Sequence, residues 1–297
     1  MEKIAFLVIA HKNPDQVSRL CKRLVNENAD VFVHWDSGAG VPNGEFPGHH
    51  FSKYKGMLND RSLVDIANLL IDEALEFEKQ NAVHFSYYAL LSGQDYPLKS
   101  TRAISEELER LYPKAFIDVT PISQANWLGA VASHCRFFAL TEPKLRMIKP
   151  ALFRKALKAP IVLIDKLLSP LFSASARAKG EGIQIFGGSA WWVLPDCVVS
   201  EIVIRRSLND ATHLFARSVY RPEEVYFQTM LMSGPYSSGI KVNSIDEVEQ
   251  NCKTYANFAP PLLVLDHLLA IHMHSREQMQ RGLKNSRSVI TLHGNSI

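Results

Sequence analysis

Short apolar runs alternate with longer helix-like segments from residue 4 to residue 119, and this alternation restricts the fold more than any other feature. The apolar runs fit strands at 4–10, 31–35, 85–92 and 115–119. The segments between them fit helices at 14–26, 61–78 and 103–111, the first with Asn13 as N-cap and Gln16 in a capping box. Such alternation predicts an α/β fold, with a parallel or mixed sheet and helices on both faces.

The pattern loosens after Thr120 and then returns. Residues 121–142 are irregular, 143–178 are helical and basic, and 179–188 form a glycine-bearing loop. A strand at 190–194 and helices at 196–207 and 222–232 follow. The chain has 297 residues, 46% of them apolar, so it can bury one large core or two modest ones. Because no linker divides it, we expect one domain, 1–297, with a helical insertion at 121–180.

Composition argues against several classes of protein. A net charge of +3 is too small to predict nucleic-acid binding. No apolar run is long enough to span a bilayer, and residues 1–10 lack a basic region with a cleavage site. Cys21, Cys135, Cys197 and Cys252 form no Cys-X-X-Cys pair, which is typical of reduced thiols. We therefore expect a soluble, unprocessed, cytoplasmic protein.

The segment from Lys144 to Lys179 is both basic and apolar. It holds nine Lys or Arg residues and one acid, Asp165, interleaved with Leu, Ile and Phe. A basic amphipathic helix can lie on the anionic inner face of a cell membrane, as a peripheral contact. The same pattern fits a surface helix with a solvated basic face, and the sequence does not separate the two.

Residues 90–100, which read LLSGQDYPLKS, connect the expected strand 85–92 to the expected helix 103–111. Pro97 fixes the backbone of this connection, so Asp95 lies in a shaped turn rather than on a mobile tip. Ligands of open α/β sheets bind at the carboxyl ends of strands. Asp95 is therefore a candidate ligand-binding residue, although a strand-to-helix connector with a solvated Asp is the simpler interpretation.

The same turn carries a family resemblance. Ser-Gly-Gln-Asp-Tyr-Pro-Leu-Lys at 92–99 resembles the signature of the core-2/I-branching β-1,6-N-acetylglucosaminyltransferases, which form glycosyltransferase family 14. Further segments match in the family's order: 4–14 (IAFLVIAHKNP), 31–36 (VFVHWD), 187–194 (GGSAWWVL) and 222–229 (PEEVYFQT). The resemblance implies a GT-A fold, a Rossmann-like mixed sheet flanked by helices. Because the membrane anchor and disulfides of the animal relatives are missing, the chain looks like a bacterial, cytoplasmic member.

Glu224 is the expected catalytic base. Pro222 stands at the first position of the expected helix 222–232, where the helix dipole favours an ionised carboxylate, although acids are common at helix starts for that reason alone. The resemblance implies that Glu224, the last residue of the family's Pro-Asp-Glu motif, deprotonates an acceptor hydroxyl in an inverting sugar transfer. Glu223 replaces the motif's Asp, which leaves open which of the two acids points inward.

The resemblance also implies a UDP-sugar donor, with N-acetylglucosamine or xylose as first expectations. His11, Asp36 and Asp95 at strand ends are the expected nucleotide-sugar contacts, although His11 and Asp36 fit local turn capping equally well. The family works without metal and binds the diphosphate through C-terminal Arg and Lys, for which Arg276 and Lys284 are the candidates. The sequence contains no Asp-X-Asp motif, so no metal cofactor is expected.

Two alternatives stay open. His272 and His274 would ligate Zn²⁺ or Mn²⁺ if their segment were a strand, as in a metal-dependent sugar transferase. The chain would instead be a catalytically inactive carbohydrate- or nucleotide-binding scaffold if its departures from the family matter. The family's Trp-Gly-Gly-X-Ser segment reads Asn-Asp-Arg-Ser at 59–62, and its C-terminal motif is missing.

Aromatic and charged residues late in the chain are the expected acceptor contacts. Indole rings stack on sugar rings, and strand alternation points only one of Trp191 and Trp192 into a cleft. Arg136 would suit an anionic acceptor and fits a surface arginine equally well. Together with Glu223, these residues predict contact with a glycan or lipid-linked glycan, such as a bacterial surface polysaccharide.

Overall fold

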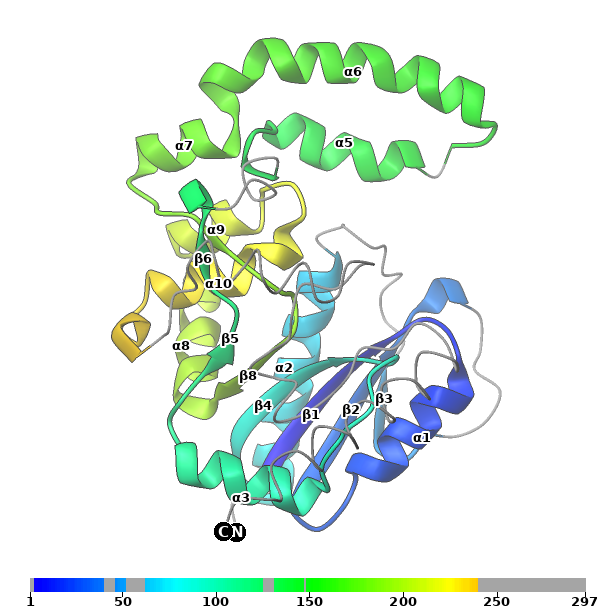
Figure 1. Ribbon diagram of the computed structural model, residues 1–297, viewed down its shortest axis with the longest axis vertical. Helices are drawn as coiled ribbons and strands as arrows, with labels where there is room; N and C mark the ends of the chain where they lie inside the picture. The colour runs from blue at the N-terminus through cyan, green and yellow to red at the C-terminus, as the bar shows by residue number, and fades with distance from the viewer. Residues whose placement is uncertain (1–2, 40–45, 52–61, 125–130, 147, 240–297) are drawn as a thin grey trace, which may run out of the picture.

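The computed structural model of the protein describes residues 3–39, 46–51, 62–124, 131–146 and 148–239. Six strands form its main sheet in the order β3-β2-β1-β4-β8-β5 (Figure 1). Their bounds are His49–Phe51 (β3), Ala29–Trp35 (β2), Lys3–Ala10 (β1), Phe85–Ser92 (β4), Trp192–Pro195 (β8) and Phe116–Ile117 (β5). The first four are parallel, and β8 runs antiparallel to β4 and β5. The predicted α/β fold with a mixed sheet is confirmed.

Helices cover both faces of this sheet, because alternate strand residues point to opposite sides. On β1, Ala5 and Leu7 pack into one buried cluster and Ile4, Phe6 and Val8 into the other. The first cluster is completed by α2 (Ser62–Asn81), α8 (Asp196–Ser207), α9 (Ala211–Ala216) and α10 (Tyr226–Met232). The second is completed by α1 (Pro14–Leu24) and α3 (Thr101–Leu111). Every residue of β4 is buried, as expected for the strand between β1 and β8.

The strand order reverses between β1 and β4. The chain passes from β1 to β2 and β3 on one side and then returns to place β4 on the other side of β1. The chain that follows β1 therefore leads to β2 on one side of the β1–β4 pair, and the chain that follows β4 leads to β5 on the other side. In open α/β sheets, this reversal point at the carboxyl ends of the strands is where ligands bind.

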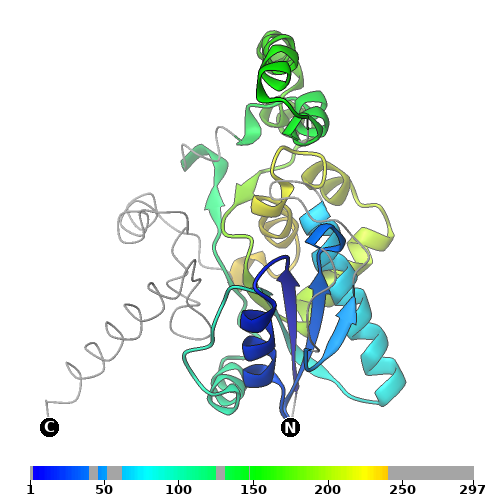
Figure 2. The ribbon, with the colours of Figure 1, turned by 90° about the vertical axis from the view of Figure 1, so that its right-hand side faces the viewer.

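Three further helices lie beyond the sheet, at one end of the molecule in both views (Figures 1 and 2). They are α5 (Arg136–Arg146), α6 (Ala151–Phe172) and α7 (Ala174–Glu181). We call α5 and α6 the helical hairpin. A two-stranded sheet of β6 (Thr120–Pro121) and β7 (Phe186–Gly187) lies where the chain leaves for these helices and returns. No helix of the described residues is both long and apolar enough to cross a bilayer.

Helix α5 begins at Arg136, inside the segment 121–142 that was expected to be irregular. Two other helix N-termini are also built differently from the sequence prediction. Asn13 has left-handed backbone angles (φ 53°), and its side chain does not cap α1. Residues 222–232 do not form one helix, because Val225 (φ −132°) separates a 3-10 turn, η3 (Pro222–Glu224), from α10. The remaining 3-10 turns of the described residues are η1 (Ser37–Ala39), η2 (Ile122–Gln124) and η4 (Ser237–Gly239).

Candidate active site

Gly93 lets the turn after β4 pack directly on the end of β1. A Cβ at this position would lie 2.7 Å from the Cβ of Ala10 and 3.0 Å from a methyl carbon of Val17. Real Cβ atoms do not approach other atoms this closely, so a larger residue would push the turn away from β1 and α1. The glycine of the Ser-Gly-Gln-Asp sequence therefore has a packing role at the strand-order reversal.

Gln94 joins the two turns that meet there. Its side-chain oxygen accepts a hydrogen bond from Asn13 Nδ2 (2.8 Å), and its Nε2 donates to the Lys12 carbonyl (3.3 Å). Gln16 Nε2 donates to the carbonyl of Asp95 (3.0 Å). Asn13 and Gln16, expected to cap their own helix, instead hold the turn after β4 in place.

Asp95 is buried, with 3% of its surface exposed, rather than solvated. Its Oδ2 accepts a hydrogen bond from the Ser92 backbone N–H (2.8 Å), and its own N–H donates to the Ser92 carbonyl (2.9 Å). One carboxylate oxygen is therefore committed to shaping the turn. That Asp95 also contacts the nucleotide stays a prediction.

His11 and Asp36 lie close together at the ends of β1 and β2. The pKa of His11 is lowered by partial burial and by Lys12, and the nearby Asp36 carboxylate opposes that shift. Asp36 Oδ1 also accepts a hydrogen bond from the Gly38 N–H (2.7 Å), so it caps the following turn as one interpretation predicted. Both residues stand at the carboxyl-end edge of the sheet, and their contact with a nucleotide stays a prediction.

The Gly-Gly-Ser and Pro-Glu-Glu segments form a second unit. The Gly188 N–H donates to the Glu224 carbonyl (2.9 Å), and Gln228 Nε2 donates to the Ser189 carbonyl (2.6 Å). Thr229 Oγ1 bonds both the N–H and the carbonyl of Phe186. A Cβ on Gly188 would lie 2.0 Å from the Asp118 carbonyl oxygen, so only glycine fits there. These contacts fix the backbone of Glu224.

The register of β8 brings this unit to the same edge as the β1 and β4 turns. Trp192, the first residue of β8, pairs with Leu90 near the end of β4. Because the two strands are antiparallel, residues 188–191 precede β8 at the end where Ser92 leaves β4. Glu224, attached through Gly188, therefore belongs to the carboxyl-end side of the sheet together with Asp36 and Asp95.

The Glu224 side chain has one bound and one unbound oxygen. Oε1 accepts a hydrogen bond from Arg221 Nη1 (3.3 Å), whereas Oε2 is buried and has no hydrogen-bond partner among the described residues. Burial raises the pKa of Glu224 above its ordinary value, and the positive charge of Arg221 opposes the rise. Sequence reasoning placed Glu224 in the first turn of a helix whose dipole would favour the ionised carboxylate. In the structure η3 is a single short turn, and burial is the larger influence on the pKa of Glu224. That Glu224 acts as the base stays a prediction.

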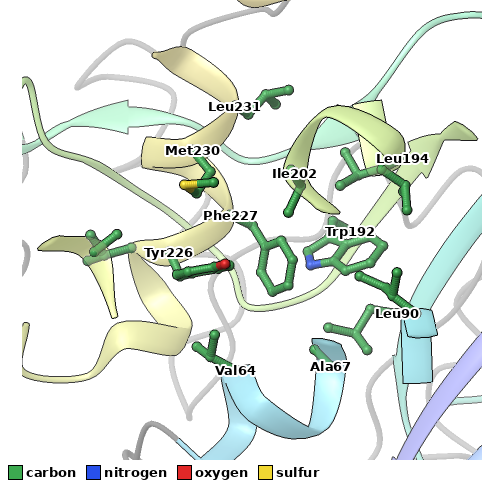
Figure 3. Close-up of a cluster of buried hydrophobic side chains, with 14 of the residues drawn as sticks. Val64, Ala67, Leu90, Trp192, Leu194, Ile202, Tyr226, Phe227, Met230 and Leu231 are labelled. Carbon is green, nitrogen blue, oxygen red and sulfur yellow. The ribbon is translucent and has the colours of Figure 1, made fainter. Parts of the chain in front are cut away.

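The expected acceptor residues have different surroundings. Trp192 is fully buried and packs on Phe227 with ring centroids 4.8 Å apart, so it belongs to the core and does not line an acceptor surface (Figure 3). Trp191 is only partly buried and precedes β8 on the site side. Arg136 is exposed at the start of α5, and Glu223 is buried with 8% of its surface exposed. That Trp191, Arg136 and Glu223 contact an acceptor stays a prediction.

Several predicted residues lie outside the described residues: Arg276, Lys284, His272 and His274. Within the described ranges, no cluster of three or more His, Cys, Asp and Glu side chains could hold a metal ion.

Arg221, Gly188 and Gln94 are the site residues that the sequence analysis did not single out. Arg221 immediately precedes the Pro-Glu-Glu motif, three residues before Glu224, which is a short enough spacing to have suggested an ion pair. Gly188 and Gln94 stood inside the quoted motifs, yet no sequence rule states which backbone groups they would contact.

Comparison with known proteins shows the family of the chain. The family model of the Core-2/I-Branching enzymes matches residues 4–256. A mouse protein, beta-1,3-galactosyl-O-glycosyl-glycoprotein beta-1,6-N-acetylglucosaminyltransferase 4, is 22% identical over 293 residues, which cover 93% of this chain and 59% of the mouse protein. The chain thus spans about three fifths of the length of this relative.

The mixed sheet with helices on both faces is of the GT-A type, the architecture of one class of glycosyltransferases. Within that class, the chain belongs to the Core-2/I-Branching enzyme family. The membership predicted from the motifs is confirmed.

Proposed function

We propose that the protein transfers a sugar from a UDP-sugar to a hydroxyl group of a glycan, with inversion at the anomeric carbon. The observation that carries the proposal is the side chain of Glu224, which has a raised pKa and one buried oxygen without a hydrogen-bond partner among the described residues. A general base works best when its pKa approaches the working pH, and burial moves Glu224 in that direction. Family membership supplies the reaction class.

In the proposed reaction, Glu224 Oε2 takes the proton of the acceptor hydroxyl while the acceptor oxygen attacks the anomeric carbon. The bond from that carbon to the diphosphate breaks on the opposite face, and UDP leaves. The attack and the departure occur on opposite faces, so the configuration inverts. A positioned base contributes roughly 10²–10⁴-fold to such a rate.

The leaving diphosphate must be stabilised by positive charge. We propose that Arg276 and Lys284 supply it without a metal ion, in keeping with a sequence that contains no Asp-X-Asp motif. His11, Asp36 and Asp95 at the strand-order reversal are the proposed nucleotide-sugar contacts. Trp191, Arg136 and Glu223 are the proposed acceptor contacts.

N-Acetylglucosamine is the first choice of donor sugar, because the name of the mouse relative specifies that sugar, and xylose is the second. The proposed acceptor is a bacterial surface glycan assembled on the cytoplasmic side of the membrane. This choice is supported by the basic segment 144–179, which would suit an anionic membrane surface.

UDP release by the full chain across a panel of UDP-sugars, with and without EDTA, tests the proposal. Slow hydrolysis of one donor is expected to survive EDTA and to be lost in Glu224→Gln. The matched control is Glu109→Gln, which changes an exposed glutamate of α3 in the same way and should retain full activity.

Three other results would redirect the assignment. Activity abolished by EDTA would favour the metal-dependent alternative with His272 and His274. Loss of activity in Glu223→Gln with Glu224→Gln unaffected would make Glu223 the base. If calorimetry detects neither turnover nor binding of any UDP-sugar, the transferase proposal is refuted.

A further inference from the structure

Helix α6 presents an apolar stripe to solvent. Leu152, Leu163, Leu167 and Leu171 are 80%, 59%, 72% and 74% exposed. Their positions, with Ala156 and Pro160 between them, follow helical spacings of three and four residues, so all six lie on one side of the helix. We call these six residues the α6 stripe. At 1.5 Å per residue it is about 28 Å long.

The opposite side of α6 carries the polar contacts. Asp165 is the one buried residue of α6, and its carboxylate accepts hydrogen bonds from the Cys135 N–H (2.8 Å) and pairs with His134 Nδ1 (2.7 Å). Lys158 pairs with Glu142 of α5 (3.0 Å). A surface helix normally turns its apolar side to the protein and its polar side to water. In α6 this polarity is reversed.

Figures 1 and 2 show α6 as the outermost element at its end of the molecule, with α5 between it and the rest of the fold. Because the polar contacts of Asp165 and Lys158 face α5 and the residues before it, the exposed stripe on the opposite side of α6 points away from the rest of the fold. Contiguous exposed apolar surface of this kind marks a place of contact with a membrane or another protein.

The charge around the stripe indicates which contact it is. Lys155 and Lys166 are exposed on one flank of the helix. The acid of α6, Asp165, faces inward and is bonded there. An apolar stripe bordered by lysines, without an outward acid, complements an anionic bilayer surface.

We propose that the protein binds an anionic membrane surface through the α6 stripe. The helix lies flat, with its leucines at the boundary between headgroups and acyl chains and its lysines at the headgroups. Asp165 bonds His134 and Cys135, just before α5, and so holds α6 in the orientation that keeps the stripe outward.

The hairpin is also joined to the candidate site. The His134 ring stacks on Phe138 (4.1 Å) and meets Tyr220 edge-on (4.9 Å), and Tyr220 precedes Arg221, the partner of Glu224. If the proposed function holds, on which this step rests, membrane binding would present a lipid-borne acceptor to the side of the fold that carries Glu224.

Vesicle co-sedimentation of the full chain tests the proposal without using activity. Vesicles of phosphatidylcholine alone are compared with vesicles in which about a third of the lipid is phosphatidylglycerol. The test variant combines Leu163→Ser, Leu167→Ser and Leu171→Ser. The matched control combines Ile204→Ser, Leu208→Ser and Leu214→Ser, which are 53%, 74% and 53% exposed outside the hairpin.

The wild type and the control should bind the anionic vesicles, and the α6 variant should bind at least about tenfold more weakly. Lys155→Glu and Lys166→Glu should each weaken binding about fivefold, and binding to neutral vesicles should be much weaker throughout. The altered leucines are exposed, so circular dichroism and the melting temperature should not change.

Several results would overturn the proposal: no vesicle binding by the wild type, equal binding to neutral and anionic vesicles, or equal loss in the control. Light scattering after gel filtration tests the rival occupant. If the wild type is a dimer without lipid and the α6 variant is a monomer, the stripe is a protein interface. Each of these readouts is independent of turnover, so failure of the proposed chemistry would not affect them.

Discussion

Among glycine-to-alanine substitutions in the described residues, Gly188→Ala should damage the site most. The new Cβ would lie 2.0 Å from the Asp118 carbonyl oxygen and 2.7 Å from its carbon. Both are backbone atoms, so no side chain can rotate away. The segment that carries Gly188 has to separate from Asp118 by about 1 Å or more, which breaks contacts that depend on its present position.

The expected cost follows from two contributions. Overpacking of a tight contact destabilises by about 1–3 kcal/mol. Displacement of Gly188 also removes its hydrogen bond to the Glu224 carbonyl (2.9 Å), and a buried group left without its partner costs about 1–3 kcal/mol. A sum near 4 kcal/mol lowers the melting temperature by roughly 8–16 °C. UDP-sugar hydrolysis should fall even in the folded fraction, because the backbone of Glu224 loses the hydrogen bond from Gly188 that holds it in place.

Differential scanning calorimetry and urea unfolding measure the change in stability. Gly180→Ala is the matched control, because its Cβ meets nothing within 4 Å and the residue lies in α7. That substitution should be neutral or stabilise by up to about 1 kcal/mol. A Gly188→Ala protein as stable and as active as wild type would refute the claim that this close approach positions Glu224.

Three further substitutions test the site and its surroundings. Arg221→Met removes the charge that opposes the burial-driven rise in the Glu224 pKa, so the acidic limb of the kcat/KM profile should move to higher pH; an unmoved limb would show that the two groups are not coupled. Gln94→Leu removes the hydrogen bonds of its side chain with Asn13 Nδ2 and the Lys12 carbonyl, and should lower the free energy of unfolding by about 1–3 kcal/mol in urea titrations. No change would mean that the turns after β1 and β4 stay together without these bonds. Burial, reinforced by two arginines, lowers the pKa of His213, so the unfolded chain binds more protons than the folded one below about pH 6.5 and the free energy of unfolding should fall as the pH falls. In His213→Gln the free energy of unfolding should decline less steeply between pH 7 and 5. An equally steep decline would show that other groups cause the effect.

The strands and helices around the sheet were predictable because their apolar spacing reports burial directly. β4 and α8 begin and end at the predicted residues, and the other predicted strands and helices before residue 120 are present with shifts of a few residues. The strand order was not predictable, because it depends on contacts between segments distant in sequence. The reversal at β1 and β4 and the antiparallel β8 bring the motifs together, and neither follows from local pattern. That residues 121–180 serve as an acceptor-side insertion in a single domain stays a prediction.

The motifs identified the site, but sequence reasoning gave some of their residues the wrong task. Asn13 and Gln16 fit helix capping by position, yet both side chains bond the turn after β4. Of the two tryptophans, strand alternation required that one be core, and only the packing of Trp192 on Phe227 shows which. Side chains near a helix start have several partners within reach, and the nearest one in sequence need not be the one that binds.

The same distinction separates the two carboxylates that the motifs brought forward. Asp95 has one oxygen bonded to the backbone of its own turn, so a substitution there changes the shape of the β4 turn as well as any contact with a nucleotide. Glu224 has its backbone held by Gly188 and its Oε2 left unbonded among the described residues, so its position is fixed by groups other than its reacting atom. A base must be held in place without using the lone pairs that accept the proton. Of the two, Glu224 meets that requirement, and the fold provides it through a glycine that no other residue can replace.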